Sequence, residues 1–296
     1  MAAGKYEYLK QSGPVPVSMT NDYQFRALMQ MNKDVLTALL EALLHRKPGQ
    51  ITSIRIKNPI KLGDYIEDKE FVLDLLVEIN GKVTVNIELQ VINQKNWPER
   101  SLAYLCREFD NLNSGEDYIE VRPVIQIGLL DFVLFPEHPE FYASYALLNE
   151  RSHKPYTDKF KIKVMELGKS NLATEEDRKW KLDKWAEFFK AKSWEEIKML
   201  AKELPVLDKA AETIYEISMD EQMRIQCMMR EEAMRRYRTN QRWMEMQAEE
   251  IEKQKAEITQ QQAEITQQQA KIAELTGTLE RLKAMMAEKG LEVDLG

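Results

Sequence analysis

The chain has 296 residues, of which 44% are hydrophobic, so it can bury one substantial core and still carry an extension. Its formal net charge of −7 and sequence pI near 5.4 argue against a generally basic nucleic-acid binder, because phosphate contacts dominate such affinity. No apolar run approaches the ~20 residues of a membrane span, and neither the two cysteines nor the opening residues indicate secretion, so we expect a cytoplasmic protein without membrane contact.

The first elements in chain order predict a loose end followed by a compact domain. Residues 1–20 contain a glycine and two prolines in their second half, which is typical of a flexible N-terminal tail. A first helix is predicted over residues 32–45 and an initial strand over residues 51–58, with a loop over residues 61–69.

Two neighbouring segments, residues 71–79 and 83–91, alternate apolar and polar side chains with period two, which predicts half-buried strands. Opposed residues of an antiparallel pair share a face, so both apolar rows are buried together only if opposed residue numbers sum to an even value. The connecting loop then needs three residues. We predict a type I turn with Gly81 in the left-handed bulge position.

This register places Asp74 on the second face of the hairpin, diagonally near Glu88, with Gln90 on the same face. Carboxylates brought together from adjacent strands repel one another, and a hard divalent cation with oxygen ligands relieves that repulsion. A hairpin with one solvated face commonly carries the same residue types. The pattern alone therefore leaves a purely structural interpretation open.

The following segments predict a mixed order of helices and strands. A helix is expected over residues 98–111, strands over residues 122–127 and 160–167, and a short strand over residues 132–134. Such an order is typical of an α/β fold.

The hairpin resembles the PD-(D/E)XK nuclease superfamily, and more narrowly the recombination-promoting nuclease and putative transposase branch called Rpn. That branch shows an aspartate on one strand and a glutamate, any residue, glutamine triplet on the next, as Asp74 and the run Glu88, Leu89, Gln90 do here. Further blocks are similar and follow the same order: Asp22 to Phe25, Val35 to Leu44, Arg100 to Leu105, Gly115 to Tyr118, Arg122 to Ile127, Met165 to Leu167 and Trp185 to Phe189. The resemblance covers residues 20 to 210.

The resemblance implies a restriction-endonuclease-like core, with a mixed central sheet flanked by helices, and divalent-metal-dependent DNA endonuclease activity. Such an activity would promote recombination or process DNA of mobile elements or defence systems. Asp74 and Glu88 would hold Mg²⁺ or Mn²⁺ together with the backbone carbonyl of Leu89, and Gln90 would orient the attacking water. Gln90 stands where the wider superfamily usually has lysine, so we expect slower chemistry or stronger metal dependence.

Two residues of the helix after the hairpin are candidates for a supporting role. Arg100 and Tyr104 lie one turn apart, so both side chains are placed to meet a phosphate or the strand that carries Glu88. An ordinary arginine stacked on a tyrosine is an equally open interpretation. Glu41, on the opening helix, is interpreted as a solvated helix residue and not as a site residue.

From about Thr174 onward the sequence predicts helices, and this part of the chain ends in a heptad repeat. The core positions seven apart hold isoleucines 251, 258, 265 and 272 and then Leu279, which predicts a coiled coil that mediates self-association. The second core position of each heptad holds glutamines 254, 261 and 268, followed by Leu275 and Leu282, so we expect the polar first half of the seam to be weak but register-specific. A single solvated helix or a Gln-rich disordered tract is the alternative.

The predicted domain organisation follows from these segments. We expect a flexible tail (residues 1–20), a nuclease core (21–173), a helical extension packed on the core (174–218), a helical arm (219–250), a coiled coil (251–289) and a flexible end (290–296).

Two functions from different classes remain. In the first, the chain is a metal-dependent endonuclease acting on DNA, and the coiled coil holds two nuclease domains at one target. In the second, it is a catalytically inactive nuclease-fold protein that serves as a coiled-coil interaction or DNA-tethering module. The intact pair Asp74 and Glu88 favours the first.

Overall fold

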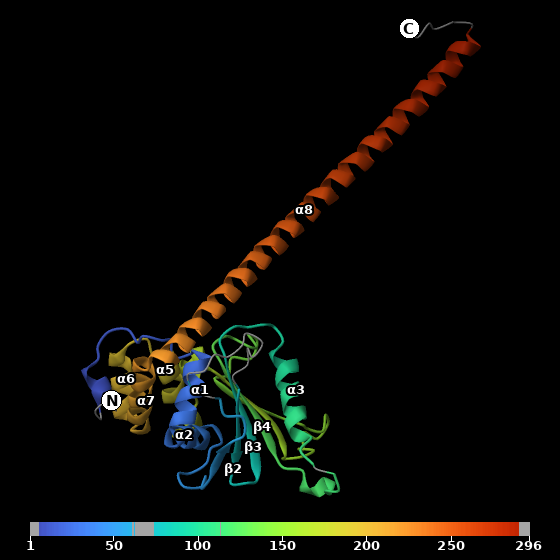
Figure 1. Ribbon diagram of the computed structural model, residues 1–296. Coiled ribbons are helices and arrows are strands. Elements are labelled where there is room, and N and C mark those ends of the chain that lie inside the picture. Colours follow the sequence, from blue (N-terminus) through green and yellow to red (C-terminus); the bar gives the residue numbers. More distant parts are fainter. Residues whose placement is uncertain (1–5, 61, 63–73, 113, 290–296) are drawn as a thin grey trace. The chain divides into compact units, whose positions relative to one another are not determined.

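A six-stranded mixed sheet with helices around it forms the folded part of the chain in the computed structural model, which describes residues 6–60, 62, 74–112 and 114–289 (Figure 1). The strands lie in the order β1-β2-β3-β4-β6-β5. Their bounds are β1 Ile54–Ile56, β2 Leu75–Ile79, β3 Val83–Gln90, β4 Val124–Leu130, β5 Tyr142–Ala146 and β6 Phe160–Glu166. The predicted α/β architecture is confirmed.

The three central strands β3, β4 and β6 run parallel, and β1, β2 and β5 join them in antiparallel pairs at the two edges. The strand predicted at residues 132–134 is wrong, since this segment follows β4 as irregular chain. The edge strand β5 was not expected. Its exposed end, with Tyr145 and Ala146 facing solvent, lacks the regular apolar alternation of the inner strands.

The helices follow the chain order of the sequence. Their bounds are η1 Glu7–Lys10, α1 Asp22–Met31, α2 Lys33–Leu43, α3 Trp97–Phe109, η2 Tyr118–Glu120, η3 Leu167–Leu172, α4 Glu175–Lys179, α5 Leu182–Lys190, α6 Trp194–Glu203, α7 Val206–Met219 and α8 Glu221–Glu288. The first predicted helix corresponds to α2, and α1 before it was not predicted. Asn32 separates the two, and its side chain caps α2 by accepting a hydrogen bond from the Val35 amide.

The residues before α1 are folded against the helical layer, so the prediction of a loose tail is wrong from residue 6 onward. Tyr8, Val17 and Met19 are buried, and the Val15 amide donates to the carbonyl of Lys192 at 3.0 Å. These apolar side chains anchor a segment whose glycine and prolines had suggested disorder. Residues 1–5 lie outside the described residues.

The β2–β3 hairpin has the predicted register and a different turn. Leu75 pairs with Ile87 and Ile79 with Val83, so three residues form the loop. Asn80 and Gly81 both have positive φ, +51° and +66°, which is typical of a type I′ turn and not of the predicted type I turn. Asn80 tolerates this conformation because its side chain binds the segment before β1, including the amide of Ser53 at 3.0 Å. Residues 71–73 of the predicted strand, and most of the loop predicted at 61–69, lie outside the described residues.

One face of the sheet carries the main hydrophobic core. Odd-numbered residues of β2 and β3, such as Val77, Val85 and Ile87, are fully buried there and join one cluster with side chains of α1, α2, α5 and α7. The aromatic residues Trp185 and Phe189 of α5 belong to this cluster. Burial of so much apolar surface is the largest stabilising contribution to this fold.

The opposite face is covered by α3. A Cβ atom on Gly128 of β4 would lie 2.2 Å from Cζ2 of Trp97, the first residue of α3, so the helix approaches the sheet where β4 has no side chain. Trp97 forms a small second core with Leu130 and Val164. This approach sets how close α3 lies to the polar residues of the neighbouring strand β3.

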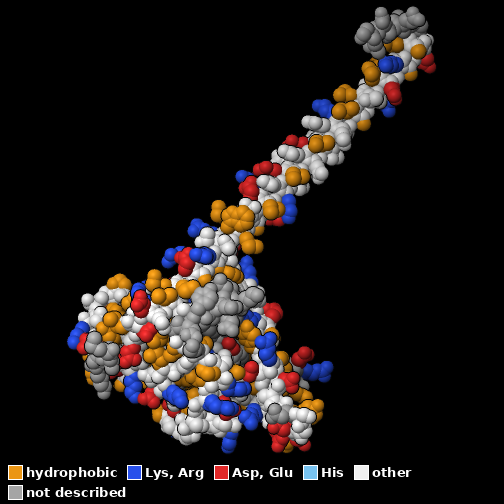
Figure 2. Space-filling model, viewed as in Figure 1, with side chains coloured by type: hydrophobic (Ala, Val, Ile, Leu, Met, Phe, Trp, Pro, Cys, Tyr) orange, Lys and Arg blue, Asp and Glu red, His pale blue; other side chains and the backbone are white. Residues whose placement is uncertain are grey.

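The chain divides into two compact units, with the boundary between Met234 and Arg235 inside α8. The first turns of α8 belong to the first unit, where Cys227 is buried and Arg230 forms an ion pair with Asp22 of α1. The second unit is the remaining helix, whose side chains are largely exposed (Figure 2). Residues 290–296, predicted as a flexible end, lie outside the described residues. Across the described residues, no helix has the length and apolar character needed to cross a membrane.

Candidate active site

The polar residues of β3 line up beneath α3. Thr84, Asn86, Glu88 and Gln90 all project from the face that α3 covers, and each is at most 8% exposed. The face expected to be solvated in a purely structural hairpin is therefore buried. Buried polar groups in such a row need partners, so their contacts indicate what the site can do.

Asp74 lies at the start of β2, on the same face. Continuing the observed register by one step places it opposite Glu88, not diagonally as predicted from the sequence. The carboxylate of Asp74 accepts a hydrogen bond from Asn86, which also donates to Oε1 of Gln126 at 3.0 Å. The two acidic side chains thus face the same space between β2, β3 and α3.

The electrostatics of Glu88 are dominated by the loss of water around it. Burial raises its pKa to about 7, the charge of Arg100 opposes this shift, and the nearby Asp74 adds to it. One carboxylate oxygen, Oε1, is 2.7 Å from Nη2 of Arg100. The other, Oε2, is buried and has no hydrogen-bond partner among the described residues.

The pKa of the Asp74 carboxyl is raised as well. Burial raises its pKa, while the hydrogen bond from Asn86 and the charges of Arg26 and Arg100 lower it. Two carboxylates whose pKa values are raised by burial therefore share one region, and among the described ion pairs Arg100 contacts one oxygen of Glu88.

A buried arginine fixes the backbone at Asp74. Arg26 of α1 is 1% exposed, and its two terminal nitrogens donate to the carbonyls of Asp74 and Asn58. The Asn58 side chain also donates to the Asp74 carbonyl at 3.1 Å and accepts from the Leu76 amide at 2.9 Å. Burial lowers the pKa of Arg26 to about 10. This arrangement holds the end of β2 from which the Asp74 side chain projects.

Gln90 and Leu89 occupy the end of β3. The amide nitrogen of Gln90 donates to the carbonyl of Ile92 at 2.9 Å, and its buried Oε1 has no hydrogen-bond partner within the described part of the chain. The Leu89 side chain belongs to the main core on the other face, so this residue can offer the site only its backbone carbonyl.

Arg100 and Tyr104 show both contacts considered for them from the sequence. Arg100 pairs with Glu88, and its guanidinium also lies over the Tyr104 ring, 5.5 Å from the centroid. Arg107 approaches the same ring at 5.6 Å. Glu41 is elsewhere: its Oε1 accepts from the amide of Gly49 at 2.8 Å in the loop that follows α2.

The oxygen donors at the site are of the type that binds a hard divalent cation, and they are few. No group of three or more His, Cys, Asp or Glu suited to a metal occurs in the described ranges. Asp74 and Glu88 supply two carboxylates, and a backbone carbonyl such as that of Leu89 would be a further oxygen donor. Oε2 of Glu88, which lacks a donor within the described ranges, is the observation that supports the fit, because a buried anionic oxygen without a donor is costly.

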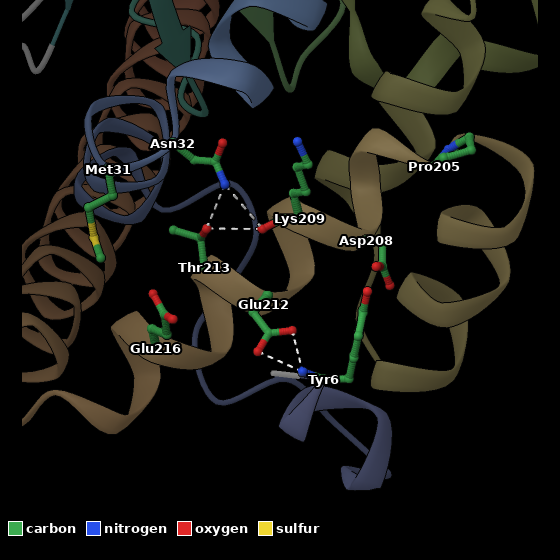
Figure 3. Close-up of a pocket in the computed structure, with 9 residues that line it drawn as sticks. All are labelled: Tyr6, Met31, Asn32, Pro205, Asp208, Lys209, Glu212, Thr213 and Glu216. Carbon is green, nitrogen blue, oxygen red and sulfur yellow. Dashed lines mark hydrogen bonds between the residues drawn. The ribbon is translucent and has the colours of Figure 1, made fainter. Parts of the chain in front are cut away.

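A separate hollow of about 460 Å³ lies between η1, the junction of α1 and α2, and α7 (Figure 3). Its polar groups already bind one another. Glu212 accepts from the Tyr6 amide at 2.7 Å, and the Asn32 amide donates to Oγ1 of Thr213 at 3.1 Å. None of the site residues predicted from the sequence lines this hollow.

Sequence reasoning missed the residues that support the acidic pair. Asn86 appears in the alternating pattern, where it resembles any solvated strand residue. Arg26 and Asn58 hold Asp74 through its backbone carbonyl, a contact between residues far apart in the chain. The one feature of the sequence that pointed to Arg26 is its place as a charged residue inside the apolar run from Phe25 to Met29.

Comparison with known proteins identifies one match. The family model described as PD-(D/E)XK nuclease family transposase matches residues 19–240, more than half of the chain. The match includes all six strands, α3 and the first turns of α8. No curated protein and no solved structure matches the chain.

Proposed function

The chain belongs to the PD-(D/E)XK nuclease family transposases, and we propose on this basis that it is a divalent-metal-dependent endonuclease that hydrolyses phosphodiester bonds of DNA. The observation that carries the proposal is the pair Asp74 and Glu88, a half-buried and a buried carboxylate at adjacent strands, with Oε2 of Glu88 lacking a hydrogen-bond partner among the described residues. The transposase description of the family supports a role in DNA recombination or in the processing of mobile-element or defence-related DNA.

The proposed roles of the site residues are metal binding and orientation of the attacking water. Asp74, Glu88 and the Leu89 carbonyl would hold Mg²⁺ or Mn²⁺. When bound, such an ion neutralises phosphate charge and makes water more acidic. Gln90 would accept from and orient the attacking water through its Oε1, which has no partner among the residues that the structure describes. Since Gln90 carries no charge, it cannot stabilise the developing negative charge as a lysine would.

Arg100 supplies the guanidinium that contacts Glu88. In the structure its guanidinium neutralises part of the charge on Glu88. A guanidinium is well suited to bind a phosphate oxygen, and Tyr104 supports it from one side. We propose that Arg100 contacts the DNA phosphate and that Tyr104 keeps its side chain in place.

The test is nicking of supercoiled plasmid DNA by the purified full chain. Wild-type protein should nick with Mg²⁺ or Mn²⁺ and stop when a chelator is added. Asp74→Asn and Glu88→Gln, which keep the side-chain shape, should each lower the rate by about a thousandfold or more, because both remove a carboxylate ligand.

Glu78→Gln is the matched control. Glu78 lies on the same face of β2 but pairs with Arg55 and Arg122 at the rim, so nicking should change little. Unchanged nicking in Asp74→Asn would remove this residue from the mechanism.

A catalytically inactive DNA-tethering or interaction module is the alternative. The Glu88–Arg100 ion pair is the observation in its favour, because an arginine already partly compensates this carboxylate. Calorimetric titration with Mg²⁺ or Mn²⁺ separates the two functions. Heat of binding that disappears in Asp74→Asn supports the nuclease, and a wild-type protein that binds neither ion supports the tethering module.

Self-association belongs to the same proposal. Cutting both strands of a duplex takes two active centres or two separate events, and a coiled coil would link two nuclease units. The heptad seam of α8 is the feature that would form it.

A further inference from the structure

The second unit presents large aliphatic side chains to solvent at heptad spacing. Isoleucines 251, 258, 265 and 272, together with leucines 275, 279 and 282, are each between 49% and 63% exposed. Figure 2 shows hydrophobic side chains along the surface of this helix. Large aliphatic side chains repeating at heptad spacing on a helix are stabilised by burial against another helix with the same spacing.

The rest of the heptad limits how many helices this row can bind. The position opposite the row holds alanines 256, 263, 270 and 284 and Gly277, and the flanking positions are mostly polar or charged. The apolar stripe is therefore one narrow seam and not the wide face of a helix buried in a globular core. A narrow seam fits a single partner helix.

The residue types at the seam select two strands. Isoleucine occupies the first core position of four successive heptads, and leucine occupies the second core position at residues 275 and 282. Isoleucine at the first position with leucine at the second favours parallel two-stranded coils over trimers and tetramers.

The glutamines select the direction and register. In a parallel, in-register pair, each of the residues Gln254, Gln261 and Gln268 meets its own counterpart, and the two amides can bond to each other. In an antiparallel pair over the same span, all three face isoleucine or leucine, which leaves buried amides without partners. Sliding a parallel pair by one heptad brings Gln268 against leucine.

The flanking charges agree with the parallel register. In this arrangement Glu250 of one copy lies beside Lys255 of the other, an attractive pair. The four following flanking pairs combine one glutamate or lysine with a neutral glutamine or threonine, so no like charges meet. The flanking side chains of two copies in parallel register therefore do not repel one another along the seam.

We propose that residues 251–282 pair with the same segment of a second copy of this chain as a parallel, in-register, two-stranded coiled coil. Because α8 runs without a break from Glu221 to Glu288, both first units then join the coil at the same end. The inference rests on the proposed function in one respect: it delivers two candidate active sites to one DNA target.

The first test measures molar mass by light scattering and sedimentation on the full chain. We expect twice the 34.7 kDa of one copy. The double variant Ile258→Asp with Ile265→Asp should be monomeric, because it places charges in the seam. Its matched control, Ala256→Asp with Ala263→Asp, puts the same residues on the outer side and should remain dimeric. A monomeric, trimeric or tetrameric wild type overturns the proposal.

The second test reads direction by disulfide formation in a Cys106→Ser background, since Cys106 is the exposed native thiol. Gln254→Cys should form a covalent dimer on mild oxidation, because parallel register brings the two thiols together. Gln260→Cys, which faces away from the seam, should not. Failure of Gln254→Cys to form a covalent dimer contradicts the parallel register.

These outcomes are independent of nuclease activity. Asp74→Asn protein should be a dimer that nicks DNA about a thousandfold more slowly. An inactive wild type would overturn the proposed function and leave the coil intact. If both proposals hold, the monomeric seam variant should still nick DNA but yield about tenfold less linear product from single binding events, because the second site is no longer tethered.

Discussion

The two faces of strand β3 are buried to a similar degree and differ in chemistry. On one face, Val85 and Ile87 pack against helices on every side. On the other, Asn86 is 1% and Glu88 3% exposed beneath α3, on the same strand and in alternation with them. Apolar burial stabilises by about 25 cal/mol per Å², whereas a buried carboxylate costs several kcal/mol unless it is compensated. The first face therefore stabilises the sheet, and the second holds the partly uncompensated carboxylate of the candidate site.

The largest expected effect on stability comes from the apolar face. Ile87→Ala should lower the free energy of unfolding by about 2–5 kcal/mol, because it leaves a cavity in a fully buried cluster. Urea denaturation measures this change. Ile87→Val is the control and should cost about 0.5–1.5 kcal/mol.

The same variant tests whether the two faces are separate in function. Calorimetric Mg²⁺ affinity per folded molecule should remain close to the wild-type value in Ile87→Ala. A large loss of affinity would show that packing on one face sets the site on the other.

A smaller effect is expected from the arginine that holds β2. Arg26→Lys keeps a charge but loses the fork that reaches two carbonyls at once, so Asp74 should be less well positioned. We expect Mg²⁺ affinity and nicking rate to fall about tenfold to a hundredfold, as for residues that orient metal ligands.

Arg55→Lys is the matched control, since Arg55 is exposed on the neighbouring strand and contacts only Glu78 among the described ion pairs. A merely structural role for Arg26 would lower the melting temperature and leave the affinity of the folded protein unchanged.

The smallest expected effect is the pH dependence of the polar face. Below the unfolded pKa of 4.5, Glu88 is protonated in both states. As pH rises toward the folded pKa of about 7, ionisation of Glu88 occurs more readily in the unfolded chain, so this residue's contribution to stability is lost. With chelator present, the melting temperature should fall across this range more in wild type than in Glu88→Gln.

Metal binding should show the opposite trend. Protons compete with the ion for the Glu88 carboxylate, so Mg²⁺ affinity should rise with pH by up to about tenfold per unit below pH 7 and level off above it. Calorimetric titrations across this range measure the slope. A flat profile would mean that Glu88 is not a ligand.

The parts of the fold set by local pattern were predictable from the sequence. The hairpin register follows from the alternation of apolar residues, which allows a single loop length. The turn type was not predictable, because it depends on contacts between Asn80 and the segment before β1. Strand β5 pairs at an edge and carries no strong apolar alternation, so nothing local identified it.

The candidate site shows the same limit. The spacing of Asp74 and Glu88 was enough to place them on one face, but whether that face is wet or buried depends on α3, which belongs to a different part of the chain. The clamp by Arg26 joins residues 48 positions apart through a backbone carbonyl, and alternation along a strand carries no information on such contacts.

Gly128 influences the position of Arg100 at the candidate site through the packing of α3. In the register of β3 and β4 it stands beside Glu88, and on α3 Trp97 precedes Arg100 by three residues on the same side of the helix. The contact of Trp97 with Gly128 and the ion pair of Arg100 with Glu88 are thus neighbouring contacts between α3 and the sheet. A methyl group at residue 128 would displace Trp97 and with it α3. The displaced helix would carry Arg100 away from its position, so the ion pair of Glu88 would change although the methyl group does not contact that carboxylate.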